Sequence, residues 1–112
     1  MQTRTLVGVS AANTEKTHTI TQPTGNKGTK DIEIRSLTVS TSGGDIGADA
    51  GVYIKDNGTI VWSVMLRSAK VFGGHFRFDN YPITIKDGDC TIVTDDAGES
   101  VLVHVSVVYN VV

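Results

Sequence analysis

Carboxylates gather in the turn-like segments of this chain, and they are the first candidates for binding a metal ion. They are Asp45, Asp49, Asp87, Asp89, Asp95, Asp96 and Glu99. Calcium takes roughly six to eight oxygen ligands, which carboxylates and backbone carbonyls of such loops can supply. Aspartate is equally common in turns because its side chain hydrogen-bonds to the nearby backbone. The Asp45-to-Asp49 spacing matches no EF-hand loop. We therefore predict no metal site and no cofactor, with calcium binding by the acidic loops as the alternative.

The three histidines lie on three separate strand-like segments, without a second ligand at a spacing typical of zinc sites. His75 has the opposite parity to Phe76 and Phe78, and His104 alternates with a run of valines. Because neighbouring residues of a strand point to opposite faces, we expect both to face solvent or a partner chain. His18 has no partner that the sequence reveals.

Patterns of the known catalytic classes are absent from the sequence. It has no Gly-x-Ser-x-Gly elbow and no His-Glu-x-x-His pair, and its glycine-rich loops lack the Lys-Ser/Thr of a phosphate-binding loop. Cys90 is the only cysteine, so the fold needs no internal disulfide. Its place in an alternating segment favours a buried structural thiol over a reactive one. We predict that the protein is not an enzyme.

Two tyrosines are candidates for binding a ligand through an aromatic face. Tyr53 has the opposite parity to Val52 and Ile54, and Tyr81 directly precedes Pro82. Both positions favour an exposed ring, which has an apolar face and a polar tip. With the acidic loops beside them, they would form the site of a lectin-like domain.

Alternation of apolar residues from Gly73 to Val112 indicates the fold class. Apolar residues occupy every second position in three runs, which are Phe76 and Phe78; Ile83 and Ile85; and Val101, Val103, Val105, Val107 and Tyr109. A period of two is typical of strands with one buried face. Turn-forming Asp and Gly residues separate the runs.

Residues 31–41 predict a strand with a change of parity inside it. Ile32 and Ile34 share one parity, whereas Leu37 and Val39 share the other. A β-bulge at Arg35-Ser36 would return both pairs to one face, and a strand that crosses between two sheets is the alternative.

Asn57-Gly58 predicts a β-hairpin, because a type I′ turn needs positive φ at both central residues. The residues of the second arm that we expect to face the core are Ile60, Trp62, Val64 and Leu66. Val61 and Met65 have the opposite parity, so we expect this strand to be central or covered on both faces.

Eight strand-like segments follow residue 14, and none of the chain has a helical period. We predict a single domain over residues 1–112, an all-β antiparallel two-sheet sandwich. An eight-strand jelly roll fits the count best, and an immunoglobulin-like sandwich is the alternative. Residues 1–14 form an N-terminal arm or an edge strand, and residues 24–28 form a loop.

Composition limits the partners of the chain. It has 112 residues, a net charge of -2 and scattered Lys and Arg, so we predict no nucleic-acid partner. No run approaches the roughly 20 apolar residues of a membrane-spanning helix, and the N-terminus shows no signal peptide. We therefore expect synthesis in a cytoplasm and no membrane partner.

Apolar residues near both ends are candidates for contacts between subunits. They are Leu6, Val7, Val9, Val111 and Val112. Apolar ends normally fray into water unless they are covered. The domain's own sheet or a neighbouring subunit would cover them.

The sequence from Gly74 onward resembles small jelly-roll virion proteins of tailed bacteriophages, such as decoration, head-fibre and adaptor components. The motifs are Gly74-x-Phe76-x-Phe78, Pro82-Ile83 leading to Gly88-Asp89, the alternating valines that end at Tyr109, and the Asp56-Asn57-Gly58 hairpin with Ile60-x-Trp62. The resemblance implies a non-enzymatic protein, often trimeric, that binds a capsid or projects from it.

We therefore expect a self-associating virion protein that decorates a capsid or builds a fibre or adaptor, with other virion proteins as partners. A carbohydrate-binding sandwich with Tyr53 and Tyr81 in its site is the alternative. A hydrolase or isomerase on a cupin-like barrel is a third reading, and it would need a clustered metal site.

Overall fold

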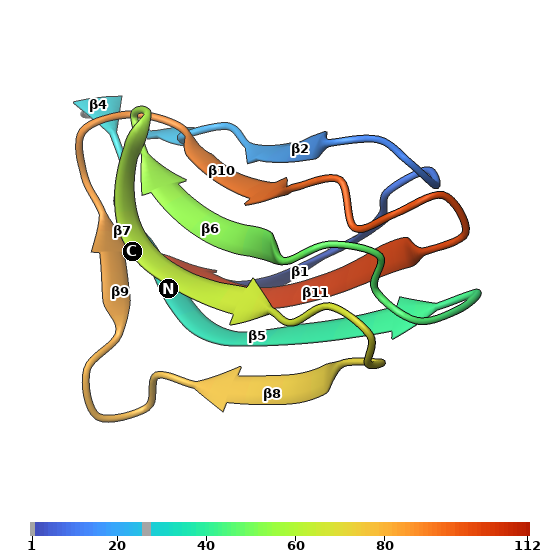
Figure 1. The fold of residues 1–112 in the computed structure, drawn as a ribbon. Helices are drawn as coiled ribbons and strands as arrows, with labels where there is room; N and C mark the ends of the chain where they lie inside the picture. The colour runs from blue at the N-terminus through green and yellow to red at the C-terminus, as the bar shows by residue number, and fades with distance from the viewer. Residues whose placement is uncertain (1, 26–27) are drawn as a thin grey trace.

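Two antiparallel β-sheets face each other in this protein, and the described part of the chain contains no helix (Figure 1). The structure is a computed structural model that describes residues 2–25 and 28–112. Its strands are β1 (Gln2–Val9), β2 (Lys16–Ile20), β3 (Thr24–Gly25), β4 (Gly28–Thr29), β5 (Ile32–Ser42), β6 (Ala50–Asp56), β7 (Thr59–Leu66), β8 (Gly73–Arg77), β9 (Ile83–Ile85), β10 (Cys90–Thr94) and β11 (Leu102–Val111). The predicted all-β sandwich is confirmed.

The strands pair in a nested series. The first sheet, sheet A, has the order β1-β11-β5-β8, with β9 also paired to β5; the second, sheet B, has the order β2-β10-β6-β7. Strands of the first half therefore pair with strands of the second half: β1 with β11, β2 with β10, β5 with β8 and β9, and β6 with β7. The N-terminal segment is the edge strand of sheet A, one of the two predicted alternatives.

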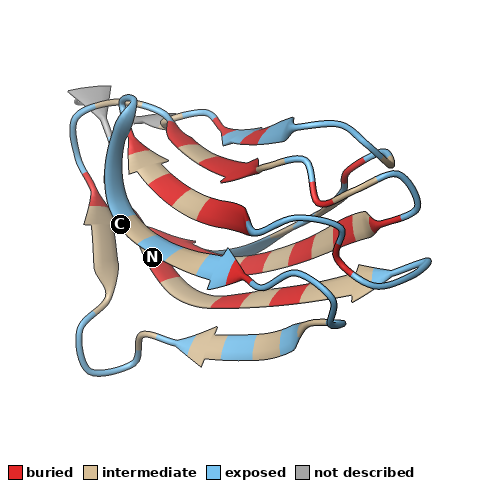
Figure 2. Ribbon diagram, in the orientation of Figure 1, coloured by how far each residue is buried: buried red, intermediate tan, exposed pale blue. Residues whose placement is uncertain are grey.

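Alternation along β11 builds one wall of the core, as predicted. Val103, Val105, Val107 and Tyr109 are buried, while the residues that alternate with them, 104, 106 and 108, are only partly covered (Figure 2). The strand lies between β1 and β5, so both of its edges are paired. Its inward valines belong to the same apolar core as the buried residues of sheet B, and burying this core stabilises the fold.

The bulge predicted in β5 is present at Arg35. Ser36 pairs with Val108 and Ile34 pairs with Tyr109, so Arg35 has no direct partner on β11. The extra residue restores the parity of the strand. The isoleucines before it (Ile32, Ile34) and the apolar pair after it (Leu37, Val39) are all fully buried.

The Asn57-Gly58 hairpin also forms, with φ of 49° at Asn57 and 87° at Gly58. The position predicted for β7 is wrong, because β7 is the edge strand of sheet B and is not central. A second bulge changes the parity of β7. Trp62 pairs with Ile54 and Ile60 pairs with Lys55, so Val61 has no direct partner on β6. Ile60, predicted to face the core, is 52% exposed for this reason.

The loop predicted over residues 24–28 is partly strand. Its first two residues form β3, its last residue belongs to β4, and these two short strands pair with each other. Residues 26 and 27 lie outside the described residues.

The glycine-rich loop between β5 and β6 is anchored by Ile46, which is buried. The Ile46 N–H donates to the Lys70 carbonyl at 2.8 Å, and the Ala69 N–H donates to the Ile46 carbonyl at 2.7 Å. This loop is therefore fixed to the β7–β8 connection.

Cys90 is fully buried, as predicted for a structural thiol. Desolvation, with the nearby Asp56 charge second, raises the pKa of Cys90 to about 12. A thiol with this pKa stays protonated at neutral pH and is a poor nucleophile.

Candidate interaction surfaces

Several carboxylates of the acidic turns hold the chain's own backbone. Asp49 accepts a hydrogen bond from the Ser68 N–H at 2.8 Å and one from the Arg67 guanidinium at 3.2 Å. The Ser68 bond, with Arg67 second, lowers the pKa of Asp49. Asp89 accepts from the Gln22 N–H at 2.7 Å in the same way. Within residues 2–25 and 28–112, no three His, Cys, Asp or Glu side chains form a group that could hold a metal ion.

Tyr53 lies on the outward face of sheet B, where its polar tip is bound within the domain. Its hydroxyl donates to Asp95 Oδ2 at 2.9 Å, and the same oxygen accepts from the Gly51 N–H at 2.9 Å. The bond to Asp95, with desolvation second, raises the pKa of Tyr53. Lys55 Nζ lies 5.9 Å from the ring centroid, within the range of a cation–π contact. The ring is half-buried on an interior strand of the sheet.

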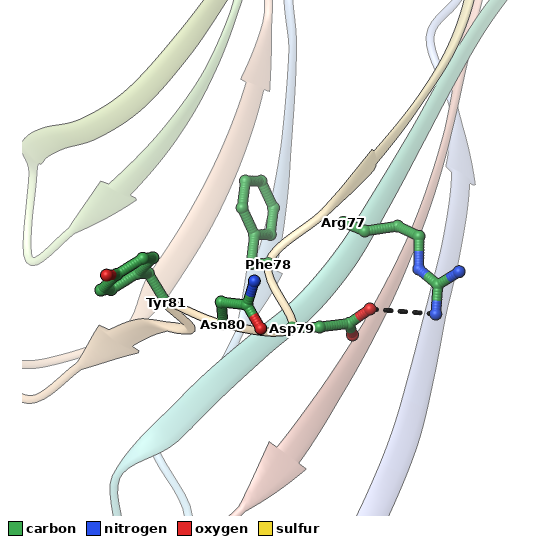
Figure 3. A pocket seen from close by; sticks show the side chains of 5 residues that line it. All are labelled: Arg77, Phe78, Asp79, Asn80 and Tyr81. Carbon is green, nitrogen blue, oxygen red and sulfur yellow. Dashed lines mark ion pairs between the residues drawn. The ribbon is translucent and has the colours of Figure 1, made fainter.

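Tyr81 lies in the connection between β8 and β9 and is 88% exposed. It borders a hollow of about 440 Å³ (Figure 3). The hollow is lined by Arg77, Phe78, Asp79, Asn80 and Tyr81. Arg77 Nη2 and Asp79 Oδ2 form an ion pair at 3.0 Å on its polar side. Tyr53 is not among the lining residues, so the hollow contains one of the two predicted ligand-binding tyrosines.

His75 and His104 face outward from sheet A, as their parity predicts. His75 Nδ1 lies 2.6 Å from Thr38 Oγ1, and His104 Nε2 lies 2.7 Å from Ser42 Oγ. Each imidazole therefore has a hydroxyl partner on β5. The outward face of β5 is therefore hydroxyl-rich.

His18 points inward from β2 and is buried between the two sheets. Its ring lies against Gly8 of β1, where a Cβ atom would collide with the imidazole. Its Nε2 has no hydrogen-bond partner among the described residues. Desolvation, with the Lys16 charge second, lowers the pKa of His18. Strand periodicity could not predict this contact, because Gly8 and His18 come from different sheets.

The predicted interface residues lie along the paired ends of the chain (Figure 1). Leu6 packs against the core, and Val111 is buried by the domain's own sheet, where it pairs with Ile32. Val7 is 74% exposed and Val9 47% exposed on the outward face of β1, and Val112 is also exposed. Of the five predicted residues, the two valines of β1 and the last valine are accessible to a partner.

A second apolar surface, which sequence reasoning missed, lies where β7 and β8 form the other open side of the sandwich. Trp62 lies 4.9 Å from Phe76 and 5.7 Å from Phe78 between ring centroids, and Phe72 stacks on Phe76 at 6.4 Å. Exposed apolar residues lie on β7 and on the β7–β8 connection. They are Ile60, Val61, Met65 and Val71. We call these eight residues the aromatic side. Three consecutive apolar residues at 60–62 were the available signal of an apolar edge.

Neither models of known protein families nor characterised protein sequences match this chain significantly. In the described part of the chain, no helix is long and apolar enough to cross a membrane.

Proposed function

We propose that this chain is a non-enzymatic structural protein of a tailed-phage particle, a self-associating subunit of the capsid-decorating, fibre or adaptor type. Its partners are then other copies of itself and other virion proteins. The observation that carries the proposal is the aromatic side, which leaves apolar side chains exposed on the edge strand β7 and on the β7–β8 connection.

The aromatic side has the composition of a protein interface. Aromatic residues and methionine are enriched in interface cores, whereas charged residues are depleted there. Val71 is 68% exposed on the connection between β7 and β8, and Arg67 and Lys70 lie on the same connection. An apolar patch with a charged margin fits a protein partner, because burying it removes apolar area from water and leaves the charges solvated.

The nested strand pairing supports the jelly roll over the immunoglobulin-like alternative. First pairs with last, second with second-last, and the β6–β7 hairpin is innermost. A long hairpin rolled so that successive pairs fall in alternate sheets has this order. Two Greek keys in two sheets define the jelly roll of many capsid proteins, which agrees with the resemblance to phage virion proteins.

Mass spectrometry of particles purified from a host that carries the gene tests the proposal. We expect peptides of this chain at a fixed ratio to the capsid protein, and the double variant Val71→Glu/Met65→Glu should be depleted from particles at least tenfold. Ser100→Glu, an exposed change in the β10–β11 connection, is the matched control and should be incorporated normally. Particles that lack the wild-type chain would contradict the virion assignment.

A carbohydrate-binding domain is the second candidate, favoured by the Tyr81 hollow. An exposed ring beside a carboxylate, an amide and a guanidinium can stack on a sugar ring and hydrogen-bond to its hydroxyl groups. Calorimetry against a broad glycan panel tests this candidate. Binding that Tyr81→Ala abolishes would support it, and the absence of binding across the panel would remove it.

A further inference from the structure

The edge of sheet A at β1 exposes a row of unpaired backbone groups. The Ser10 N–H donates to the Val103 carbonyl at 2.9 Å. This bond shows which residues beside β11 direct their backbone groups toward it. N–H and C=O groups alternate in direction along a strand. The even-numbered residues of β1 therefore bond to β11, and the odd-numbered residues point their backbone groups away from it. Those residues are Thr3, Thr5, Val7 and Val9.

The other edges of the two sheets are less suited to pairing. β7 carries a bulge at Val61, and bulges are a common device that prevents an edge from pairing. β2 and β8 each have five residues, and β8 begins with two glycines. By contrast, β1 pairs with β11 through eight residues without a shift of register and contains no proline. It is the longest unbroken edge in the described part of the chain.

A second copy of this chain matches that edge. In an antiparallel pair of two β1 strands, a two-fold axis at Leu6 places Thr3 opposite Val9 of the second copy and Thr5 opposite Val7 of the second copy. Every free backbone group of the four odd-numbered residues then has a partner. An axis at Val7 pairs fewer of these groups, because Thr3 would lie opposite Ala11 of the second copy, which lies beyond the end of β1.

Side chains agree with the Leu6 register. The outward residues would form β-branched pairs, Thr with Val, which are favourable cross-strand neighbours. The inward Arg4 would lie opposite Gly8 of the second copy, which has no side chain to meet it. An axis at Arg4 would instead place two like charges directly opposite each other, which is destabilising.

We propose that two copies of this chain join through antiparallel pairing of their β1 strands, with the two-fold axis at Leu6, so that the two A sheets become one continuous sheet. The proposal rests on the self-association proposed above, and it names the strand and the register that carry it. An isologous contact of this kind closes on itself and gives a dimer.

Disulfide trapping tests the register. Residues in a non-hydrogen-bonded antiparallel pair have Cα atoms about 4.5 Å apart, within the range of a disulfide. Leu6→Cys should therefore give a covalent dimer under mild oxidation, and Thr5→Cys should give at least tenfold less. Cys90 is buried and does not compete. Cross-linking stronger at Thr5→Cys, or absent from both variants, would overturn the register.

Sedimentation equilibrium with Val7→Pro tests the contact without a change in the core. Proline is tolerated at a sheet edge where its missing N–H faces solvent, as the Val7 N–H does. We expect wild-type mass near twice 11.9 kDa. Val7→Pro should raise the dissociation constant about thirtyfold, since each dimer loses two hydrogen bonds. Val7→Ala keeps the N–H and should stay within about threefold of wild type.

The possible outcomes separate the two proposals. A wild-type monomer would overturn the dimer and the self-association together. A trimer, or a dimer that persists in Val7→Pro, would overturn the β1 contact and leave self-association standing. Incorporation into particles is measured separately, so a dimer that is absent from particles would contradict only the virion assignment.

Discussion

The two open sides of this sandwich expose different chemical groups. On one side, β1 and β2 leave a straight backbone edge, and the gap between the sheets is closed by His18 against Gly8. On the other side, β7 is bulged and the gap is filled by Trp62, Phe76 and Phe78. The β1 side therefore offers directional hydrogen bonds, and the aromatic side offers apolar area that many shapes of partner could cover.

This difference assigns different partners to the two sides. Backbone groups at a sheet edge need another strand in a defined register, so they select a copy of the same chain or an extended peptide. Apolar area needs only a complementary surface, so it suits attachment to a different protein. The virion subunit proposed above would have both needs, because it would join its own copies and dock on a particle.

The largest effect is expected at the rings of the aromatic side. Trp62→Ala should lower the free energy of unfolding by about 3 kcal/mol, because it removes a large side chain from the contact between the two sheets. Urea denaturation measures this loss. Met65→Ala, on the same strand but outward, should change stability by less than about 0.5 kcal/mol. Equal losses in both variants would mean that the rings do not close this side.

On the β1 side, Gly8→Ala should cost about 2 kcal/mol, because the added Cβ atom collides with the His18 ring and the overpacked site must shift. A double-mutant cycle sharpens the test. In a His18→Ala background the same change should cost much less, and the coupling energy reports the contact. Additive losses would show that the imidazole does not occupy the space above Gly8.

A smaller effect is expected at the hairpin that sets the register of β7. Gly58 has φ of 87°, so Gly58→Ala should cost about 1 kcal/mol of stability. Asn57→Gly should hardly change stability, because glycine also tolerates positive φ at this position. Thermal unfolding of the two variants checks the pair. A neutral Gly58→Ala would mean that the turn is not held in the type I′ form.

The smallest effect is a pH dependence that belongs to the β1 side alone. His18 has a pKa below its usual 6.5, mainly because of burial, so the unfolded chain binds this proton more readily than the folded chain. The free energy of unfolding therefore has its full value above about pH 6.5. It decreases as the pH drops from there toward the lowered pKa of His18. Urea titrations between pH 7.5 and 5 should show the fall in wild type and in His75→Gln but not in His18→Gln. The same fall in wild type and in both variants would show that a group other than His18 binds the proton.

The sequence predicted the strands better than the order of the strands. The β5 bulge was visible because two buried pairs, before and after Arg35, had opposite parity. The β7 bulge was hidden because Ile60, Val61 and Trp62 are all apolar, so parity alone could not place the extra residue. Nothing local marks a strand as an edge, because that depends on pairings made far along the chain.

The interaction surfaces show the same limit. The exposed valines of β1 and the outward histidines followed from parity, which is a local property. The aromatic side required knowledge that β7 and β8 border the same gap, and the His18 contact required the packing of two sheets. A single isoleucine among glycines, Ile46, was the one local sign that the β5–β6 loop is anchored.

Amide hydrogen exchange along β1, measured by NMR at low and high protein concentration, tests the pairing of its free edge most directly. At high concentration the odd-numbered amides, at Thr3, Thr5, Val7 and Val9, should become protected, while those of Leu6 and Gly8 are protected throughout by β11. Free exchange of the odd-numbered amides at every concentration would contradict the account.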